Sequence, residues 1–287
     1  MIHDKKLLAL YGLKWHPFQP DIPKEALWVQ PGMDSFFFRI EDLVRHGGFA
    51  MISGEPGVGK SKILQQLAHR LSRLEDVLVG VMERPQSSVG DFYREMGALF
   101  GVNLSPANRY GGFKALRERW LTHIKSTLFR PVLLIDEGQE MVAACLNELR
   151  LLTSANFDSQ SLLTTVIAGE LRLPERFRAG PLVSLGTRVR VRLNLEPLSR
   201  DHLMDYLEHT LMEAGAPQLM SDPLRQTLAD HSCGNLRLLN SMAEEMLAAA
   251  VQKEAPQLDE KLFLEIFSRR APQPRKARSA QGVSKNV

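Results

Sequence analysis

A glycine-rich segment of the chain has the spacing of a phosphate-binding loop. Residues 54–61 read Gly-Glu-Pro-Gly-Val-Gly-Lys-Ser, which is a glycine, four residues and then Gly-Lys-Ser. Glycines in such a turn allow backbone N–H groups to wrap phosphate oxygens at the positive end of the helix that follows. The Lys60 ammonium then reaches the β and γ phosphates of a nucleotide, and the Ser61 hydroxyl ligates Mg²⁺. The segment therefore predicts an ATP site formed by Gly54, Glu55, Pro56, Gly57, Val58, Gly59, Lys60, Ser61 and Lys62.

Two adjacent acidic residues, Asp136 and Glu137, follow the aliphatic run Val-Leu-Leu-Ile. A carboxylate at the carboxyl end of a buried strand lies where α/β sheets bind their ligands. We expect Asp136 to hold the hydration shell of Mg²⁺ and Glu137 to polarise the attacking water. This pair favours hydrolysis over binding alone. The alternative is that Asp136 caps the next helix and Glu137 is a solvated acid in its first turn.

The pattern of apolar residues predicts the elements that position these two motifs. Short apolar segments at residues 49–52, 77–81, 132–135, 162–168 and 189–195 alternate with stretches of helical periodicity. This alternation favours a parallel sheet covered by helices on both faces, that is, a three-layer αβα core. The glycine-rich segment then lies between the first strand and a helix, and the acidic pair ends the third strand.

Four regions are predicted along the chain. Residues 1–48 form an extended lead and a helix packed on the core, and residues 49–196 form the α/β core itself. From residue 197 the strand signals stop, and residues 197–270 are expected to form a small all-helical domain. Residues 271–287 are expected to be a flexible tail. This tail carries four basic residues and no acid, so the net charge of +3 lies there and argues only weakly for nucleic-acid binding.

The composition is that of a globular protein. Of 287 residues, 44% are hydrophobic and 24% are charged, which excludes disordered, collagen-like and disulfide-scaffold classes. The longest apolar runs fall short of the roughly 18 residues that span a bilayer. The two cysteines are typical of buried, reduced thiols, and no His-Glu-x-x-His or Gly-x-Ser-x-Gly pattern supports metalloenzyme or serine-hydrolase chemistry. We therefore expect a cytoplasmic protein without a membrane partner.

With both motifs placed, the chain resembles the AAA+ ATPases over residues ~10 to 270, and most closely the branch of ExeA-like ATPases and the transposition regulators TniB and TnsC. Tyr-Gly-Leu-Lys at 11–14 with Pro17-Phe18 is similar to the N-terminal signature of that branch, and Asp-Glu-Gly-Gln at 136–139 is similar to its Asp-Glu-Ala-Gln segment. The resemblance implies an AAA+ P-loop core with a helical lid. Where the branch usually has Gly-Gln at its first sensor, this chain has Gly169-Glu170. An acid there would repel a γ-phosphate, so either a nearby residue such as Thr165 senses it or sensing is altered.

The same resemblance suggests further site residues. Arg188 looks like the arginine finger that reaches the nucleotide of a neighbouring subunit. The alternative is that it lies on the solvated face of a strand of alternating arginines. Arg237, in Gly-Asn-Leu-Arg, resembles the second sensor on the lid, and the alternative is an exposed helix arginine. Trp28 and Val29 would flank the adenine, although an aromatic in this segment also suits a packed core.

The resemblance implies an ATP-bound homo-oligomer, a ring or helical filament, on double-stranded DNA. This assembly would recruit a transposase, and possibly a target-selecting protein, and hydrolysis would dissolve it. The alternatives are an ExeA-like ATPase that assists secretion or pilus assembly, and a scaffold that hydrolyses ATP slowly. DNA contacts would be made to phosphates, and each candidate could equally be a solvated surface residue. The candidates are Arg84, Ser87, Ser88, Arg109, Lys114, Arg117 and Arg119.

Overall fold

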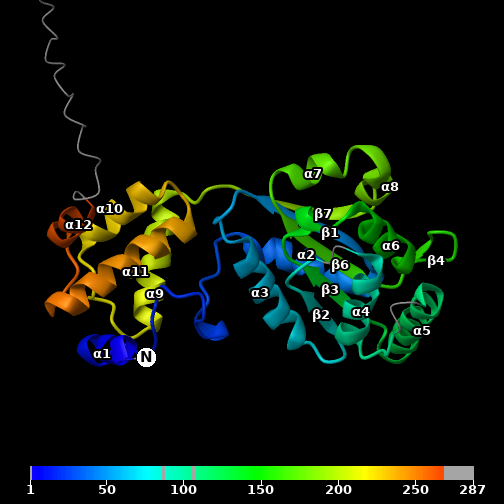
Figure 1. Cartoon of the computed structure of the whole chain (residues 1–287), viewed down its shortest axis with the longest axis horizontal. Coiled ribbons are helices and arrows are strands. Elements are labelled where there is room, and N and C mark those ends of the chain that lie inside the picture. The colour runs from blue at the N-terminus through cyan, green and yellow to red at the C-terminus, as the bar shows by residue number, and fades with distance from the viewer. Residues whose placement is uncertain (1, 86–87, 105–107, 268–287) are drawn as a thin grey trace, which may run out of the picture.

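A computed structural model describes residues 2–85, 88–104 and 108–267 of the chain. A sheet-containing core and a helical region lie side by side and are joined by two segments of chain (Figure 1). The core sheet has the order β2-β3-β6-β1-β7, and every neighbouring pair is parallel. Its strands are β1 (Gly48–Gly54), β2 (Val79–Met82), β3 (Val132–Ile135), β6 (Thr164–Gly169) and β7 (Val189–Leu195). The predicted parallel α/β core is confirmed.

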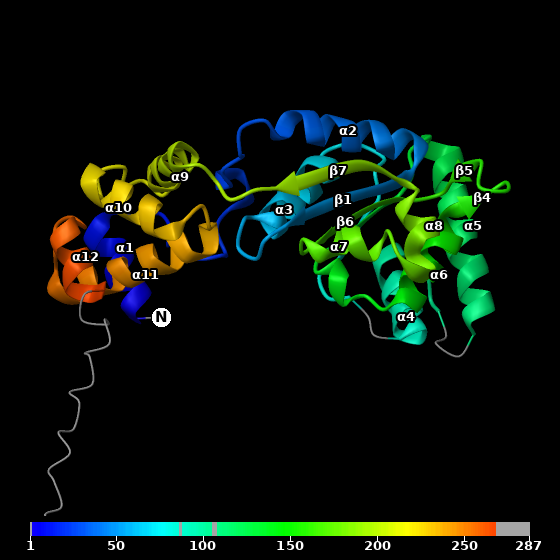
Figure 2. The same ribbon diagram turned by 90° about the horizontal axis from the view of Figure 1, so that it is seen from above.

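Helices cover both faces of the sheet, and the alternation of side chains along β1 shows why. Ala50 and Ile52 pack with α2 (Met33–His46) and α3 (Lys60–Ser72), whereas Phe49 and Met51 belong to the core on the opposite face. That opposite face is covered by α4 (Val89–Phe100), α5 (Arg109–Thr127) and α6 (Ala143–Thr153). Figure 2 shows α2 on one side of the sheet and α4 and α6 on the other.

The strand order determines where the two sequence motifs meet. Strand β6 lies between β1 and β3, with Ser53 opposite Gly169 and Ile135 opposite Ile167. Because all three strands run in the same direction, the segments that follow Gly54, Ile135 and Gly169 leave the sheet at one edge. The loops after β1 and β3 are separated there by one strand, an arrangement that places ligands at the carboxyl edge of open α/β sheets.

The helical C-terminal region is also confirmed. It comprises α9 (Arg200–Glu213), α10 (Asp222–Ser232), α11 (Leu236–Lys253) and α12 (Glu260–Phe267), which share one hydrophobic core. The remaining elements are the short helices η1 (Lys24–Ala26), η2 (Gly138–Glu140), α7 (Arg172–Arg176), η3 (Gly180–Leu182) and α8 (Val183–Gly186), and the two-stranded hairpin of β4 (Ser154–Ala155) and β5 (Gln160–Ser161). Across the described ranges, no helix is both long and apolar enough to cross a membrane.

The N-terminal segment is divided between the two parts of the molecule, which differs from the prediction that residues 1–48 pack on the α/β core. Helix α1 (Ile2–Tyr11) packs against α11, and Leu7, Leu13 and Phe18 are buried in the core of the helical region. Only α2 packs on the sheet. The physical reason is that these apolar side chains are buried by α11 and its neighbours, which lie 180 or more residues away in the sequence.

A buried hydrogen bond joins helices α4 and α6, and its removal provides a stability test. The Tyr93 hydroxyl, 1% exposed, donates to Glu148 Oε2 at 2.9 Å, and Arg109 Nε donates to the same oxygen at 3.0 Å. We expect Tyr93→Phe to lower the free energy of unfolding by about 1.5–3 kcal/mol, because a charged acceptor loses a buried donor. Urea denaturation measures this loss, with Tyr110→Phe as control because Tyr110 is 73% exposed. An equal midpoint for Tyr93→Phe and the control would contradict the prediction.

Candidate nucleotide-binding site

The glycine-rich segment joins the end of β1 to the start of α3 at Lys60. Gly57 and Gly59 have φ values of 88° and 106°, which glycine adopts without steric cost. The Val58 side chain is 2% exposed and packs in the sheet core, so only its backbone faces the loop interior. Lys60 Nζ donates to the carbonyl oxygens of Gly54 at 3.0 Å and Glu55 at 2.8 Å. The loop is therefore folded around the Lys60 ammonium.

Charges gather around this lysine. Burial lowers the pKa of Lys60 from its ordinary value, and the carboxylates of Glu137, Asp136 and Glu170 act in the opposite direction. These three acids come from the segments after β3 and β6. The fold thus brings together a cation and three carboxylates that are as much as 110 residues apart in the sequence.

The acidic pair after β3 includes a backbone conformation that is uncommon for residues other than glycine. Asp136 Oδ1 accepts a hydrogen bond from the Glu137 backbone N–H at 2.9 Å, and Glu137 has φ of 50°, in the left-handed region. The Glu137 side chain is exposed and Asp136 is half-buried. Non-glycine residues held in this region often occur at functional sites.

Glu170, directly after β6, lies beside this pair, whereas Thr165 does not. Thr165 is fully buried and pairs with Phe49 and Leu133 near the amino-terminal end of β6. Five residues of extended strand, about 15 Å, separate it from Glu170. Thr165, named as one residue that could sense a γ-phosphate in place of residue 170, therefore does not reach the site, because its side chain lies inside the sheet and away from the carboxyl edge.

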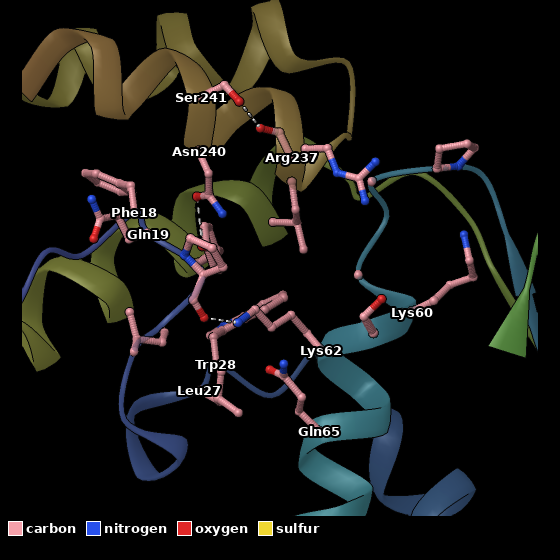
Figure 3. Close-up of a pocket in the computed structure, with 18 of the residues that line it drawn as sticks. Phe18, Gln19, Leu27, Trp28, Lys60, Lys62, Gln65, Arg237, Asn240 and Ser241 are labelled. Carbon is pink, nitrogen blue, oxygen red and sulfur yellow. Dashed lines mark hydrogen bonds between the residues drawn. The ribbon is translucent and has the colours of Figure 1, made fainter. Parts of the chain in front are cut away.

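Lys60 and the acidic residues Glu137 and Glu170 face a cavity of about 540 Å³ between the α/β core, the N-terminal lead and the helical region. Figure 3 shows Lys60, Lys62 and Gln65 coming from α3 on one side and Arg237, Asn240 and Ser241 coming from α11 on the other. Ser61 also lines the cavity. Its volume lies within the range of ligand pockets, roughly 300–1,000 Å³.

The lead contributes Trp28 to the cavity but not Val29. The Trp28 ring packs edge-on against Tyr206 with centroids 5.6 Å apart, and the Tyr206 hydroxyl donates to Asn240 Oδ1 at 2.8 Å. Val29 is 47% exposed and lines a separate cavity with residues of α2 and α3. The prediction that Val29 flanks an adenine is wrong. The chain passes between the two cavities at this point, and the adjacent side chains of Trp28 and Val29 face different cavities. Lys62 Nζ donates to the Pro20 carbonyl at 2.8 Å, which ties α3 to the lead.

The helical region is bonded directly to the glycine-rich loop. Asn235 Nδ2 donates to the Pro56 carbonyl at 2.9 Å, and the Arg237 N–H donates to the Gly57 carbonyl at 3.2 Å. A Cβ at Gly57 would lie 2.2 Å from Asn235 Oδ1, so glycine permits this close approach. Asn235 was not among the predicted site residues, although an Asn immediately before a helix is a capping signal, and its Oδ1 does accept from the Leu238 N–H at 3.1 Å.

Comparison with known proteins agrees with this geometry. Residues 43–177 match the family model of the AAA domain. Over residues 43–177 the chain therefore resembles an AAA domain. Over 208 residues it is 30% identical to General secretion pathway protein A of Aeromonas hydrophila, which covers 71% of this chain but only 37% of that relative. The chain thus spans less than half the length of the curated relative that it matches.

Solved structures share the AAA+ P-loop α/β fold of this chain. Cdc6p from Pyrobaculum aerophilum is 16% identical, with a TM-score of 0.63 over 84% of this chain and 67% of that one. The ORC1 protein of Aeropyrum pernix in complex with DNA is 20% identical, with a TM-score of 0.62 over 88% of this chain and 68% of that one. At these identities the likeness concerns the fold.

Arg188 lies away from the cavity of its own chain. It directly precedes β7, at the amino-terminal edge of the sheet, whereas the cavity lies at the carboxyl edge. Its guanidinium forms an ion pair with Asp158 in the turn between β4 and β5, and donates to the Ser184 carbonyl. Within one chain Arg188 therefore does not line the cavity.

The predicted DNA-contacting residues on α5 have partners within the α/β core. Arg109 pairs with Glu148, Arg117 Nη1 donates to the Leu152 carbonyl at 2.9 Å, and Lys114 lies over the Tyr110 ring. Arg119 Nε donates to the Phe100 carbonyl at 3.5 Å. Ser88 caps α4 by accepting from the Asp91 N–H, and Arg84 follows β2. Ser87 and the tail at 271–287 lie outside the described residues.

Proposed function

We propose that this chain binds ATP with Mg²⁺ and hydrolyses ATP to ADP and phosphate. The observation that carries the proposal is the convergence of Lys60, Ser61, Glu137 and Arg237 on one cavity of about 540 Å³. These side chains come from three separate segments, the start of α3, the loop after β3 and α11, and their chemistry suits a triphosphate: two cations, a hydroxyl and a carboxylate. The AAA domain and its relatives support the same conclusion.

The loop and α3 are proposed to hold the phosphates. The backbone N–H groups of residues 57–61 lie at the N-terminus of a helix of 13 residues, where the helix dipole favours an anion. Lys60, now bonded to Gly54 and Glu55, would exchange these carbonyl partners for phosphate oxygens. Arg237 adds a second cation from the helical region.

The site also suits Mg²⁺. The Ser61 hydroxyl and the Asp136 carboxylate are hard oxygen donors, which this ion prefers, and they lie at the same edge of the sheet. When bound, Mg²⁺ neutralises part of the charge on the phosphate oxygens. The exposed Glu137 carboxylate would accept the proton of the attacking water. At the other end of the cavity, Trp28 offers a flat apolar surface for the base.

We further propose that the ATP-bound chain forms a homo-oligomer on duplex DNA and regulates transposition by recruiting a transposase. The sequence resemblance to TniB and TnsC supports this, and the same fold occurs in ORC1 of Aeropyrum pernix, whose structure was solved in complex with DNA. The position of Arg188, remote from its own cavity, suits action between neighbouring subunits. The contacts would be made to DNA phosphates and would not depend on base sequence.

Binding of labelled random-sequence duplex DNA, measured by fluorescence polarisation, tests this proposal. We expect binding with a slowly hydrolysed ATP analogue, weaker binding with ADP, and a dissociation constant that increases with salt concentration. Lys60→Ala serves as the control because it should abolish the difference between the two nucleotides. Equal binding in all nucleotide states, or no binding at low salt, contradicts the DNA-dependent part of the proposal.

A second candidate function is assistance to secretion, which the similarity to General secretion pathway protein A favours. In that case the nucleotide state would control a protein partner instead of DNA. The same binding experiment, combined with a phosphate-release assay, separates the two candidates. ATP hydrolysis without DNA binding in any state would support the secretion role.

A further inference from the structure

The side chain of Gln139 joins two acidic residues at the edge of the sheet. Its Oε1 accepts a hydrogen bond from the Glu170 backbone N–H at 3.1 Å, and its Nε2 donates to Glu137 Oε2. Gln139 itself lies in η2, the turn that follows Asp136 and Glu137. One side chain thus connects the loop after β3 with the end of β6.

The orientation of this amide is determined by its partners. The Glu170 backbone N–H is only a donor, so it must meet the carbonyl oxygen of Gln139. The amide nitrogen then points to Glu137, whose carboxylate is an acceptor. Both ends of the Gln139 amide are therefore used by groups that line the cavity.

The backbone around Gln139 is held as firmly as its side chain. Arg176 Nη1 donates to the Gln139 carbonyl and its Nη2 donates to the Met141 carbonyl, both at 2.7 Å. A Cβ at Gly138 would lie 2.3 Å from Ile167 Cγ2, and one at Gly169 would lie 2.7 Å from Gln139 Oε1. The two glycines therefore allow this loop to lie directly against β6.

We propose that Gln139 is a positioning residue that holds the Glu137 carboxylate in place for water activation and links it to the end of β6. This inference rests on the proposed ATPase function. Glu137 is exposed and has few neighbours that could fix its side chain. Among the described residues, Gln139 supplies the one side-chain hydrogen bond to the Glu137 carboxylate. In this arrangement, a shift of the Glu170 backbone when a γ-phosphate binds or leaves would change the orientation of the Gln139 amide. The position of the Glu137 carboxylate would change with it.

Steady-state hydrolysis by Gln139→Met tests the positioning role, because methionine keeps the length of the side chain and removes both hydrogen bonds. We expect kcat to fall about 10-fold, while KM and the dissociation constant for ATP stay within about 2-fold of wild type. Gln257→Met is the matched control, since Gln257 forms its amide bond to the Gln218 carbonyl in the helical region. An unchanged kcat, or a parallel loss of kcat, ATP binding and melting temperature, would overturn the inference.

Hydrogen exchange at the Glu170 backbone amide provides a readout that does not need turnover. We expect this amide to exchange faster in Gln139→Met than in wild type and in Gln257→Met, because its acceptor has been removed. Equal exchange rates in the three proteins also overturn the inference. A wild-type protein that binds ATP without hydrolysing it would contradict the proposed function instead, so the two failures are distinguishable.

Discussion

Replacement of Glu137 by glutamine is expected to lower kcat for ATP hydrolysis by about 10²- to 10⁴-fold and to leave ATP binding intact. The amide keeps the size of the side chain but cannot accept the proton of the attacking water. The phosphate-binding groups, Lys60 and the backbone of the glycine-rich loop, are unchanged. ATP-bound oligomers should therefore accumulate, because the step that dissolves them is blocked.

Phosphate release and ATP binding, measured on the same preparation, check this prediction. Glu140→Gln is the matched control, because Glu140 is an exposed acid of the same η2 turn that does not line the cavity. The control should retain wild-type turnover. If turnover by Glu137→Gln is equal to that of the control, Glu137 is not the general base, and the carboxylates of Asp136 and Glu170 become the candidates.

If Arg188 acts as the proposed arginine finger, its replacement by alanine is expected to reduce hydrolysis in the assembled protein by about 10³-fold or more. The guanidinium would neutralise charge that develops on the γ-phosphoryl group of the adjacent subunit. In the isolated chain Arg188 is paired with Asp158, so this pair must open when subunits assemble. Nucleotide binding to the isolated subunit should be unaffected, because Arg188 does not line its own cavity.

A mixing experiment shows whether Arg188 acts between subunits. Arg188→Ala and Glu137→Gln proteins should each be nearly inactive, and their mixture should recover part of the wild-type rate. Recovery occurs where an intact Glu137 from one variant meets an intact Arg188 from the other. Arg190→Ala, which removes an exposed arginine of β7 two residues after Arg188, should retain activity. A mixture as inactive as its components would mean that Arg188 acts within its own chain or only in folding.

The phosphate-binding segment and the acidic pair are local patterns, which explains why the sequence alone predicted them. Residues 54–61 form one continuous segment of the chain. The apolar residues before Gly54 and before Asp136 identify the strands at whose ends the two motifs lie. Parallel strands place their carboxyl ends at one edge of the sheet, so the meeting of the two motifs also followed from the pattern. The helical character of residues after 197 was equally local.

Contacts between distant segments carry no such local signal, so they are seen only once the chain is folded. The opposite outcomes for Trp28 and Val29 depend on which of two cavities each side chain faces. The partners of Gln139 and Asn235 lie 31 and 179 residues away, and a hydrogen-bonding side chain looks the same in the sequence whichever partner it finds. The chemical groups available at each motif follow from the amino-acid sequence. The packing of the helical region and the N-terminal lead against the core determined which of those groups share a cavity, because burial and hydrogen bonding depend on proximity in space and not on separation along the chain.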